Sequence, residues 1–491
     1  MDELIPLRLD ALDRLPRAVA TPSYARSALS PGIVHIGLGN FHRAHQAWYT
    51  HRLMQAGAAQ DWAIIGAGVR SGDGVMRAKL LAQDCLTTLI ALDPAGRSAE
   101  VTGAMLDFVP VQGDNAALIT RMAARDIRIV SLTVTEGGYF RDPLSGTLDT
   151  DHPGIRFDAA NPDTPRTVFG AIVAALQRRR AEGAGPFTAL CCDNLQDNGA
   201  ILRQTIVALA RLSDPGLADW IDAECSFPSS MVDCIVPATG PREIALAREF
   251  GIDDAAPVTH ETFRQWVIQD DFCAGRPDWD RAGAVFTTDV HAYETMKIRL
   301  LNGGHQMICG AGELLGLDTI AATMAHDGIR GLFRKVCLSE VAPHVAPVPG
   351  MCVPDYVELI EARFANPEIL DTTRRVAFDG SSRHAGFIVP SIRDGLAGGT
   401  PVEGLALVSA LWALYCTGRR ADGSEIASND PLWTELTVAA NAALSRSEAW
   451  LERVHIYGDL KDASRFAHAF GDWHRALLAE GVEAALARYV A

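Results

Sequence analysis

The sequence predicts an α/β protein of two domains, a doubly wound parallel sheet in residues 1–288 and an all-α-helical domain in residues 289–491. In the first domain, short apolar segments alternate with helical ones, as in sheets that are covered by helices on both faces. In the second domain, helical periodicity dominates instead. The length of 491 residues also exceeds what one ordinary hydrophobic core needs, which favours more than one domain.

The predicted strands are apolar almost throughout, which is typical of strands buried on both faces. In the second domain, loops at 343–350 and 378–386 separate the helical stretches. The predicted strands are 33–37, 62–69, 127–135 and 187–192, and the predicted helices are 42–57, 116–125, 166–180, 201–212, 291–316, 318–341, 353–365, 401–417, 431–445 and 464–489.

The charge and cysteine content disfavour several classes of function. The net charge of −16 and the pI of about 5.3 argue against nucleic-acid or anionic-membrane partners, which need a basic excess. The N-terminal stretch MDELIPLRLDALDRLP is unlike a signal peptide, and no apolar run approaches the roughly 20 residues of a membrane span. Ten cysteines without C-x-x-C pairs or zinc-ligand spacing predict reduced thiols, a cytoplasmic location and no bound metal.

A glycine turn follows the first predicted strand, in IVHIGLGNFHRAH. Gly37 permits a tight turn, and Gly39 lets the backbone approach a pyrophosphate at the start of the next helix, as in Rossmann dinucleotide-binding domains. His42 replaces the third glycine of G-x-G-x-x-G, so a plain strand-to-helix turn is the alternative. We assign the whole turn, with Asn40 and Phe41, to a cofactor site.

An acidic residue follows the second predicted strand, in IIGAGVRSGDG. Rossmann domains commonly place an acid there, where it accepts hydrogen bonds from the ribose hydroxyls and favours NAD over NADP. Asp73 is the candidate, with Arg70 nearby, although it lies farther from the glycines than the usual spacing of about 20 residues. A solvated loop aspartate is the alternative interpretation. Gly72 supplies no second negative charge.

The stretch MKIRLLNGGHQM predicts a helix that carries a lysine on an apolar face. At about 100° per residue, Lys297, Asn302 and His305 lie within an arc of about 140° that also holds isoleucine and leucine. Only four of the 44 basic residues are lysines. Arginine cannot lose its proton near neutral pH, whereas a desolvated lysine can, so we hypothesise that Lys297 is a general base.

Other interpretations exist for the same segment. A lysine whose stem covers apolar surface while its ammonium reaches solvent is the common case. YETMK also matches the Y-x-x-x-K pair of short-chain dehydrogenases, but those chains are much shorter and their glycine motif differs. Gly303 and Gly304 each cost about 1 kcal/mol relative to alanine in a helix, which we interpret as the close approach of another group.

Seven stretches together resemble the long-chain mannitol dehydrogenase family of polyol-specific, metal-independent dehydrogenases. They occur in family order along nearly the whole chain: GLGNFHRAHQAWYT, SLTVTEGGY, CCDNLQDNG, FRQWVIQDDF, GRPDWD, MKIRLLNGGHQM and DGSSR. The most specific feature is K-x4-N-x2-H. The resemblance implies an expanded Rossmann domain and a helical domain, with substrate in the cleft between them. It also implies NAD-dependent oxidation of a sugar alcohol to a ketose, with mannitol to fructose ranked first, by a monomer or small homo-oligomer.

The resemblance further implies roles for individual residues. Lys297 resembles the base that takes the alcohol proton while hydride leaves for the nicotinamide. The amides of Asn194 and Asn302 resemble the pair that holds the developing charge on oxygen. The remaining positions are His305 as a ligand of substrate hydroxyls, Glu294 as a proton carrier between Lys297 and solvent, and Asp233, Arg375 and Arg383 as residues lining the polyol site.

Departures from the family pattern leave the substrate open. Cys234 replaces the arginine of M-V-D-R-I, and Arg383 replaces the lysine that often ends D-G-S-S-K. D-arabinitol, sorbitol and altritol are alternative polyols. A hexuronate reductase for fructuronate or tagaturonate is a further alternative, because the Arg383 fork can grip a carboxylate, although that branch reads closer to D-G-S-Q-K-L-P. A non-catalytic dinucleotide sensor on the same fold is the alternative outside enzymes.

Overall fold

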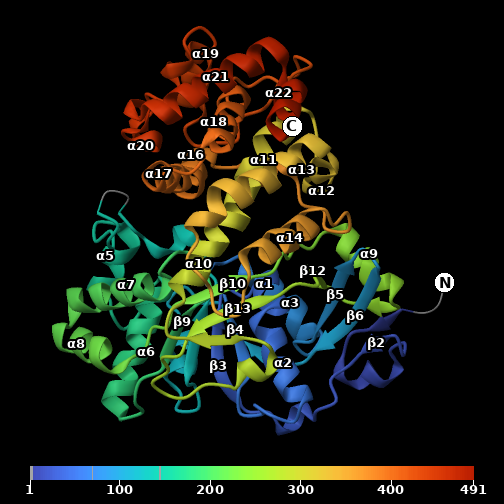
Figure 1. Cartoon of the computed structure of the whole chain (residues 1–491). Coiled ribbons are helices and arrows are strands. Elements are labelled where there is room, and N and C mark those ends of the chain that lie inside the picture. Colours follow the sequence, from blue (N-terminus) through green and yellow to red (C-terminus); the bar gives the residue numbers. More distant parts are fainter. Residues whose placement is uncertain (1–3, 69, 143–144) are drawn as a thin grey trace. The chain divides into compact units, whose positions relative to one another are not determined.

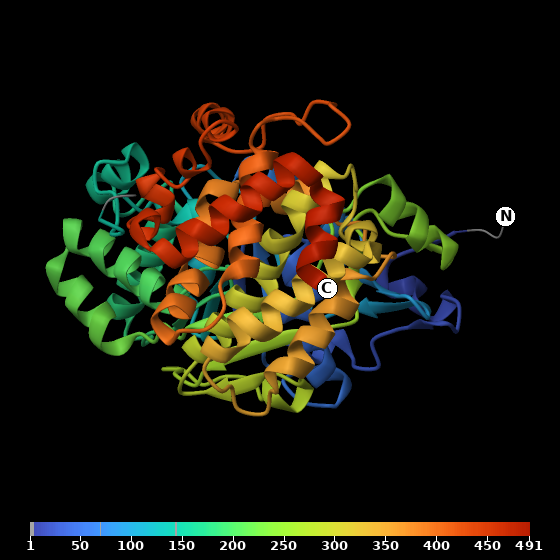
Figure 2. The same cartoon turned by 45° about the horizontal axis from the view of Figure 1, so that its top comes forward.

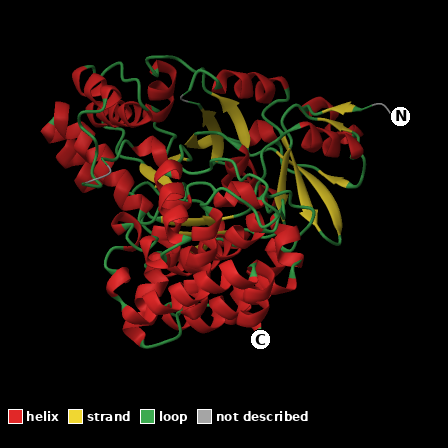
Figure 3. Cartoon of the chain, turned by 90° about the horizontal axis from the view of Figure 1, so that it is seen from above, coloured by secondary structure: helices red, strands yellow, loops and turns green. Residues whose placement is uncertain are grey.

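The computed structural model describes residues 4–68, 70–142 and 145–491 (Figure 1). The chain folds into two compact units, unit 1 at Met1–His291 and unit 2 at Ala292–Ala491. In Figure 3, where strands are yellow, the described strands all belong to unit 1. Unit 1 contains the predicted parallel sheet and unit 2 is helical, so the α/β class with a Rossmann-type N-terminal domain and a helical C-terminal domain is confirmed.

The centre of unit 1 is a five-stranded sheet in which every pairing is parallel. The chain first adds strands on one side of β3 and then returns to add strands on the other side. This creates a topological switch point between β3 and β8, where proteins of this type bind ligands beside the carboxyl ends of the strands. In sheet order the strands are β7 (Met105–Phe108), β4 (Ala63–Ala67), β3 (Pro31–Ile36), β8 (Ile129–Leu132) and β9 (Thr188–Cys191).

Alternate residues of this sheet enter two different hydrophobic cores. Ile33 and Ile129 pack into a layer with α2 (Gln46–Gln55), whereas Val34 and Val130 pack into the opposite layer. Both faces are therefore covered, which explains why the strands are apolar throughout. The opposite layer contains α4 (Ala116–Ala123), α5 (Pro153–Ala160), α6 (Val168–Glu182), α7 (Asn198–Ser213) and α8 (Pro215–Glu224).

Three smaller sheets complete unit 1, and the sequence pattern predicted none of their strands. Their strands are short or mix polar with apolar residues, so they carry a weak periodic signal. The sheets are β12 (Val258–Glu261), β5 (Thr87–Asp93), β6 (Gly96–Thr102) and β2 (Val19–Ala20); β10 (Ser230–Asp233), β13 (Gln265–Gln269) and β14 (Val285–Thr287); and β1 (Ile5–Pro6) with β11 (Ile252–Asp253), while α9 (Pro241–Glu249) precedes β11.

Several predicted boundaries in unit 1 were wrong. The helix predicted at 42–57 is interrupted at His45, whose φ of −120° and ψ of −97° separate α1 (Asn40–Ala44) from α2. The strand predicted at 127–135 ends at Leu132, before the backbone turns at Thr135 with φ of 70°. The strand predicted at 62–69 ends at Ala67, and residue 69 lies outside the described residues.

Unit 2 contains the predicted helices, but some are divided. The segment 318–341 consists of α12 (Ile320–Ala325), α13 (Asp327–Val336) and a π-helical turn. The segment 464–489 is interrupted at Gly481, which has φ of 86°. In unit 2, α18 (Glu403–Tyr415) is buried along nearly its whole length. It packs against α11 (Gly303–Leu314) and α21 (Ser464–Glu480). Figures 1 and 2 show the orange α18 beside the red α21 in both views.

The other helices of this half of the chain are mostly short. No helix among the described residues is long and apolar enough to cross a membrane. In order, the remaining bounds are α10 (His291–Lys297), α11 (Gly303–Leu314), α14 (Val353–Phe364), α15 (Thr373–Ala377), α16 (Gly380–Arg383), α17 (Val389–Gly398), α18 (Glu403–Tyr415), α19 (Trp433–Ala443), α20 (Val454–Tyr457), α21 (Ser464–Glu480) and α22 (Val482–Val490).

Candidate active site

The turn after β3 requires glycine at its first position. Gly37 has φ of +91°, and a Cβ there would lie 2.0 Å from the carbonyl oxygen of Thr133. The Gly37 N–H donates to the Ala67 carbonyl at 2.9 Å, which joins the ends of β3 and β4. By contrast, a Cβ on Gly39 would meet only the Gly37 oxygen, at 3.9 Å. Open space therefore lies at the start of α1, where the pyrophosphate of a dinucleotide fits in Rossmann domains.

A buried hydrogen-bond chain supports the carbonyl of Gly37. The hydroxyl of Thr133 donates to the Gly37 oxygen at 2.7 Å and lies 2.9 Å from Nε2 of His35. Nδ1 of His35 is 2.8 Å from the hydroxyl of Ser131. Burial lowers the pKa of His35 to about 3, so the ring is neutral at physiological pH.

His42 stands where the usual motif has its third glycine, and it has a packing role. Its ring stacks on the ring of His35, with centroids 3.4 Å apart and planes 14° apart. The residue is 1% exposed, and burial holds the pKa of His42 well below its ordinary value. In the usual motif, the third glycine lets the helix pack closely on the strand. Here a neutral imidazole ring fills the space between them instead.

The side chains of Asn40 and Phe41 fix the start of α1. Nδ2 of Asn40 donates to the Pro237 carbonyl and to the Thr239 hydroxyl, both at 2.9 Å. The ring of Phe41 stacks on His45, with centroids 4.7 Å apart. A role for Asn40 in cofactor binding therefore rests on its backbone rather than on its amide.

Asp73 lies at the carboxyl end of β4, beside the glycine turn. It is the first residue of α3 (Asp73–Ala82), and its Oδ2 accepts the backbone N–H of Arg70 at 2.8 Å. A Cβ on Gly68 would lie 2.3 Å from the Asp73 Cβ, so Asp73 lies against the residue that directly follows β4. The Arg70 side chain is exposed. Because β4 is the neighbour of β3, Asp73 lies at the sheet edge that also carries the glycine turn.

Asp193 is a buried acid at the same sheet edge that sequence reasoning missed. Its carboxylate accepts the backbone N–H groups of Val134 at 3.1 Å and Thr135 at 2.8 Å, and the hydroxyl of Tyr139 at 2.7 Å. Thr135 has φ of 70° and ψ of 158°, a region that β-branched residues avoid. Asp193 therefore fixes a strained loop after β8. It stands inside the quoted stretch CCDNLQDNG, but its partners are about 60 residues away and leave no local pattern.

Asn194 and Asp233 occupy strand ends in unit 1. Asn194 directly follows Asp193 and is exposed at the carboxyl end of β9, on the same sheet edge as Gly37. Asp233 is the last residue of β10, pairs with Gln265 of β13 and is 5% exposed. Asn194 is therefore an exposed residue at this edge, whereas Asp233 is mostly covered.

In unit 2, a π-helical turn separates α10 from α11 and changes the phase of the predicted helix. The turn is Ile298–Asn302, and the N–H of Gly303 bonds to the carbonyl of Ile298, five residues earlier. A π turn takes up one extra residue. Measured from Lys297, Asn302 therefore falls at about 40° and His305 at about −20°, instead of about 140° and 80°. The three side chains share an arc of about 60°, narrower than the uniform helix predicted.

Lys297 and Glu294 are both buried, at 7% and 4% exposed. They are three residues apart on α10, so their side chains are neighbours on one helix face. The neighbouring glycines serve packing. A Cβ on Gly304 would lie 2.7 Å from the ring of Phe333 in α13. The interpretation that these glycines mark the close approach of another group is therefore confirmed for Gly304, where that group is the ring of Phe333.

His305 is held neutral in a pocket of charged and aromatic groups. Its ring packs on Phe364 with centroids 4.1 Å apart. Burial lowers the pKa of His305 to about 3; nearby Asp371 opposes this, whereas Arg375, Arg363 and Arg383 reinforce it. Among the described residues, its Nδ1 is buried without a hydrogen-bond partner. A half-buried, neutral imidazole with that unused nitrogen is suited to hydrogen-bond a hydroxyl group.

Arg375 lies on α15, and Arg383 of α16 contacts the backbone of α15. The carboxylate of Asp371 accepts from Nε of Arg375 at 2.5 Å and also from Nη2, a bidentate pair that raises the pKa of the arginine. Nη1 of Arg383 donates to the Val376 carbonyl at 2.8 Å, and the same oxygen accepts from Nε2 of Gln306 at 2.9 Å. This carbonyl therefore ties α11, α15 and α16 together. Asp371 was not predicted, because a lone acid in a loop is usually solvated.

Comparison with known proteins identifies the family. The models of the mannitol dehydrogenase Rossmann domain and C-terminal domain match residues 31–281 and 289–477. A mannitol 2-dehydrogenase from Cereibacter sphaeroides is 53% identical over 477 residues, which cover 97% of this chain and 100% of that protein. One from Aspergillus terreus is 38% identical over 480 residues, covering 96% of each. The chain belongs to the mannitol dehydrogenase family, as the seven sequence stretches predicted.

Two solved structures share the whole fold. The ternary complex of Pseudomonas fluorescens mannitol 2-dehydrogenase with NAD and D-mannitol is 40% identical, covers 99% of both chains and gives a TM-score of 0.87. A D-sorbitol dehydrogenase in substrate-free form is 32% identical, covers 98% of this chain and 100% of that one, and gives a TM-score of 0.92. Both relatives are polyol dehydrogenases by name, so the fold carries this class of activity in its near relatives.

Proposed function

We propose that this protein is an NAD-dependent polyol dehydrogenase that oxidises mannitol to fructose without a metal ion. The observation that carries the proposal is the 53% identity, over 97% of the chain, to a mannitol 2-dehydrogenase. The solved complex of a relative with NAD and D-mannitol supports the same pair of ligands. The ten cysteines form no disulfide, which fits the cytoplasmic location that we also propose.

The cofactor proposal rests on the sheet edge of unit 1. Gly37 and Gly39 would hold the pyrophosphate, and the Asp73 carboxylate would accept hydrogen bonds from the adenine ribose. Bound NAD supplies the acceptor for hydride from the substrate carbon. The strained loop at Thr135 stands at the switch point beside Gly37, where Asp193 keeps its backbone in place.

The proposed path of the substrate proton uses two side chains of α10, Lys297 and Glu294. Lys297, which is buried, would take the proton of the substrate hydroxyl at its Nζ. Glu294, the neighbour on the same helix face, would then carry the proton from Lys297 to solvent. The amides of Asn302 and Asn194 would donate hydrogen bonds to the substrate oxygen as it becomes a carbonyl.

The substrate proposal rests on the groups around His305. Neutral His305 would hydrogen-bond one hydroxyl of the polyol through a ring nitrogen, and Arg375, Arg383 and Asp233 would hold others. Both arginines are engaged by protein oxygens, Arg375 by the Asp371 carboxylate and Arg383 by a backbone carbonyl. That engagement favours a neutral polyol over the carboxylate of a hexuronate, which would compete with Asp371. D-sorbitol is the second candidate, favoured by the TM-score of 0.92 to a D-sorbitol dehydrogenase.

The test is NAD reduction with mannitol, sorbitol, D-arabinitol and altritol, together with fructuronate and tagaturonate in the reductive direction. We expect the highest kcat/KM with mannitol. A higher value with another polyol moves the assignment to that polyol, and turnover of the hexuronates alone overturns it. The same assay after prolonged EDTA treatment, with metal content measured by mass spectrometry, tests metal independence. Stoichiometric metal whose removal abolishes turnover would contradict that part of the proposal.

A further inference from the structure

Loop 418–430, from Gly418 to Asp430, connects α18 to α19, and most of its residues are exposed. Ile426 is the exception at 2% exposed, and its N–H donates to the Gly418 carbonyl at 2.8 Å. The loop therefore closes on itself around one buried apolar side chain. Its outward polar contacts reach α11, α15 and α16, the three elements that carry the proposed polyol-binding side chains of unit 2.

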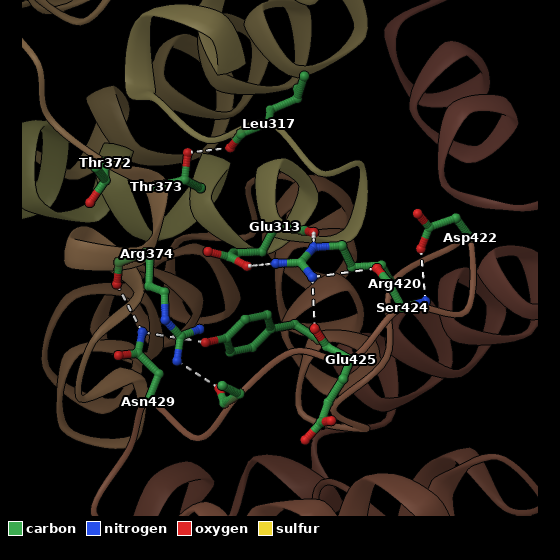
Figure 4. Close-up of polar contacts among 12 residues, drawn as sticks. Glu313, Leu317, Thr372, Thr373, Arg374, Arg420, Asp422, Ser424, Glu425 and Asn429 are labelled. Atoms are coloured by element: carbon green, nitrogen blue, oxygen red, sulfur yellow. Dashed lines mark hydrogen bonds and ion pairs between the residues drawn. The ribbon is translucent and has the colours of Figure 1, made fainter.

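The first contact reaches the end of α11 through Arg420 (Figure 4). Its guanidinium donates to Glu313 twice, from Nε to the backbone oxygen and from Nη2 to Oε2, both at 3.1 Å. Nη1 donates back to the Glu425 carbonyl at 2.7 Å, and the Ala421 N–H donates to the Leu314 carbonyl at 3.1 Å. The Glu313 side chain is 6% exposed, so water screens this ion pair little. The same helix carries His305 in its first turn.

The second contact holds α15 through Arg374. Nη2 of Arg374 donates to the carbonyls of Ala427 and Ser428, both at 2.8 Å, and Nδ2 of Asn429 donates to the Arg374 carbonyl at 2.8 Å. Figure 4 shows Asn429 and Arg374 facing one another. Arg374 is therefore fixed at both its side chain and its backbone, directly before Arg375.

The third contact holds the turn into α16. The Asp379 N–H donates to the Asn429 carbonyl at 3.0 Å. The carboxylate of Asp430 accepts the Ser381 N–H at 2.7 Å and the Ser381 hydroxyl at 2.8 Å. Asp379 has φ of 54°, so this turn uses a left-handed residue that needs support from its surroundings. Asp430 thus supplies the cap of the helix that ends in Arg383.

We propose that loop 418–430 positions Arg375 and Arg383 and thereby sets the affinity for the polyol. Neighbouring residues of the loop, Asn429 and Asp430, hold α15 and α16 at once, and Arg383 is itself bonded to α15 through the Val376 carbonyl. A shift of the loop therefore moves both arginines together. This inference rests on the proposed function. Contacts to hydroxyl groups far from the reacting carbon act equally on bound substrate and transition state, so their loss raises KM more than it lowers kcat.

The test compares four variants in the mannitol assay. Asp430→Ala removes the cap of α16, and Asp430→Asn keeps one acceptor oxygen. Asn429→Ala removes the bonds that the amide donates to the Arg374 carbonyl and to the Tyr415 hydroxyl. Asp422→Ala is the matched control, because Asp422 lies in the same loop and accepts the Ser424 N–H at 2.8 Å inside it. We expect the KM for mannitol to rise about tenfold in Asp430→Ala, below the roughly 10²-fold that an ångström of misplacement can cost. Asp430→Asn and Asn429→Ala should give smaller increases, and Asp422→Ala none.

Further readouts separate positioning from simple loss of structure. The KM for NAD should stay within twofold of wild type in all four variants, since the proposed cofactor residues lie in unit 1. The double variant Arg374→Ala/Asn429→Ala should raise KM by less than the product of its single effects, because both residues serve one contact. If Asp430→Ala does not fold, Asn429→Ala carries the test. A lowered Tm with unchanged KM for mannitol overturns the inference, whereas absence of mannitol turnover in the wild type overturns the proposed function instead.

Discussion

The carboxylate of Asp193 accepts the backbone N–H of Thr135 at 2.8 Å and holds that threonine at φ of 70°. Such backbone strain costs about 1–3 kcal/mol and persists only where the surroundings impose it. We expect Asp193→Ala to lower the free energy of unfolding by about 3 kcal/mol, because buried N–H groups lose a charged acceptor. Its kcat/KM with NAD and polyol should fall more than tenfold as the loop after β8 relaxes.

Asp214→Ala is the matched control for this variant. Asp214 also accepts a backbone N–H, that of Leu217 at 2.9 Å, but it caps α8 and has no contact with the loop after β8. It should cost about 1 kcal/mol of stability and leave kcat/KM unchanged. Urea unfolding and steady-state kinetics measure both effects. Wild-type kcat/KM in folded Asp193→Ala would show that the strained loop is irrelevant to activity.

Gly37→Ala should abolish binding of NAD. The added Cβ would lie 2.0 Å from the Thr133 carbonyl oxygen, so the ends of β3 and β8 have to separate. Gly57→Ala is the control, because Gly57 also has positive φ, 76°, but nothing within 4 Å of the added carbon. It should cost about 1 kcal/mol of stability and leave the Kd for NAD, measured by calorimetry, unchanged. Equal Kd values for wild type and Gly37→Ala would remove this turn from the cofactor site.

Lys297→Ala should lower kcat about 10²- to 10⁴-fold while NAD still binds, because a positioned general base supplies this range of rate. Lys297→Arg should lose as much, since arginine keeps its proton. Small primary amines should partly restore turnover to the alanine variant only. In the wild type, kcat/KM for oxidation should rise with pH as the lysine deprotonates. Lys79→Ala, at an exposed position, serves as the control. A wild-type kcat in the Lys297→Arg variant would rule out Lys297 as the general base.

Asp73→Ala should weaken NAD and improve NADP, because the carboxylate accepts from the ribose 2′-OH and repels a 2′-phosphate. Asp73→Asn separates these two effects. It keeps an acceptor for the Arg70 N–H, which lies 2.8 Å from Oδ2, but removes the charge. The ratio of kcat/KM for NADP to that for NAD should therefore rise in both variants. Asp73→Asn should bind NAD more tightly than Asp73→Ala does. An unchanged ratio in both would place the ribose elsewhere.

Buried neutral histidines should make the protein lose stability in mild acid. His35, His260, His305 and His384 each have a pKa lowered to about 3 by burial, against about 6.5 when unfolded. Below pH 6.5 the unfolded chain therefore binds protons that the native chain does not. The free energy of unfolding falls by up to about 1.4 kcal/mol per pH unit for each histidine, and above pH 6.5 this contribution is constant.

Denaturant unfolding between pH 7 and 5 measures this slope. His384→Gln should make the slope shallower by about one histidine, although the variant is less stable at pH 7 because the ring stacks on Trp412. A slope in His384→Gln equal to that of the wild type would mean that His384 is already protonated in the native protein.

The sequence predicted those parts of the fold that repeat a local pattern. The apolar strands, the helices between them and the glycine turn at Gly37 all follow from periodicity or backbone conformation, which are properties of neighbouring residues. The hairpin of β5 and β6 and the acids Asp193 and Asp371 were missed, because their partners are distant in sequence or their strands are half polar. The site residues that resemblance supplied, such as Asn194 and Asp233, carry no periodic signal at all.

The phase of α10 and α11 was missed for a different reason. Sequence gives the number of residues between Lys297 and Asn302, but not the number of residues in each turn. A uniform α-helix would place the three side chains within an arc of about 140° around the helix axis. The π turn reduces this arc to about 60°. The prediction that they share a face was right, and the angle was wrong.

The π turn at Ile298–Asn302 also affects how related sequences should be aligned. A helix of uniform α pitch would present the same three side chains in the same phase if one residue between Lys297 and Asn302 were absent, giving K-x3-N-x2-H. The extra position at Ile298–Asn302 is what a single-codon insertion into such a helix leaves behind. An alignment that places a one-residue gap in this segment therefore matches residues of equivalent orientation. A relative with the shorter spacing should be counted as keeping this constellation rather than as having lost it.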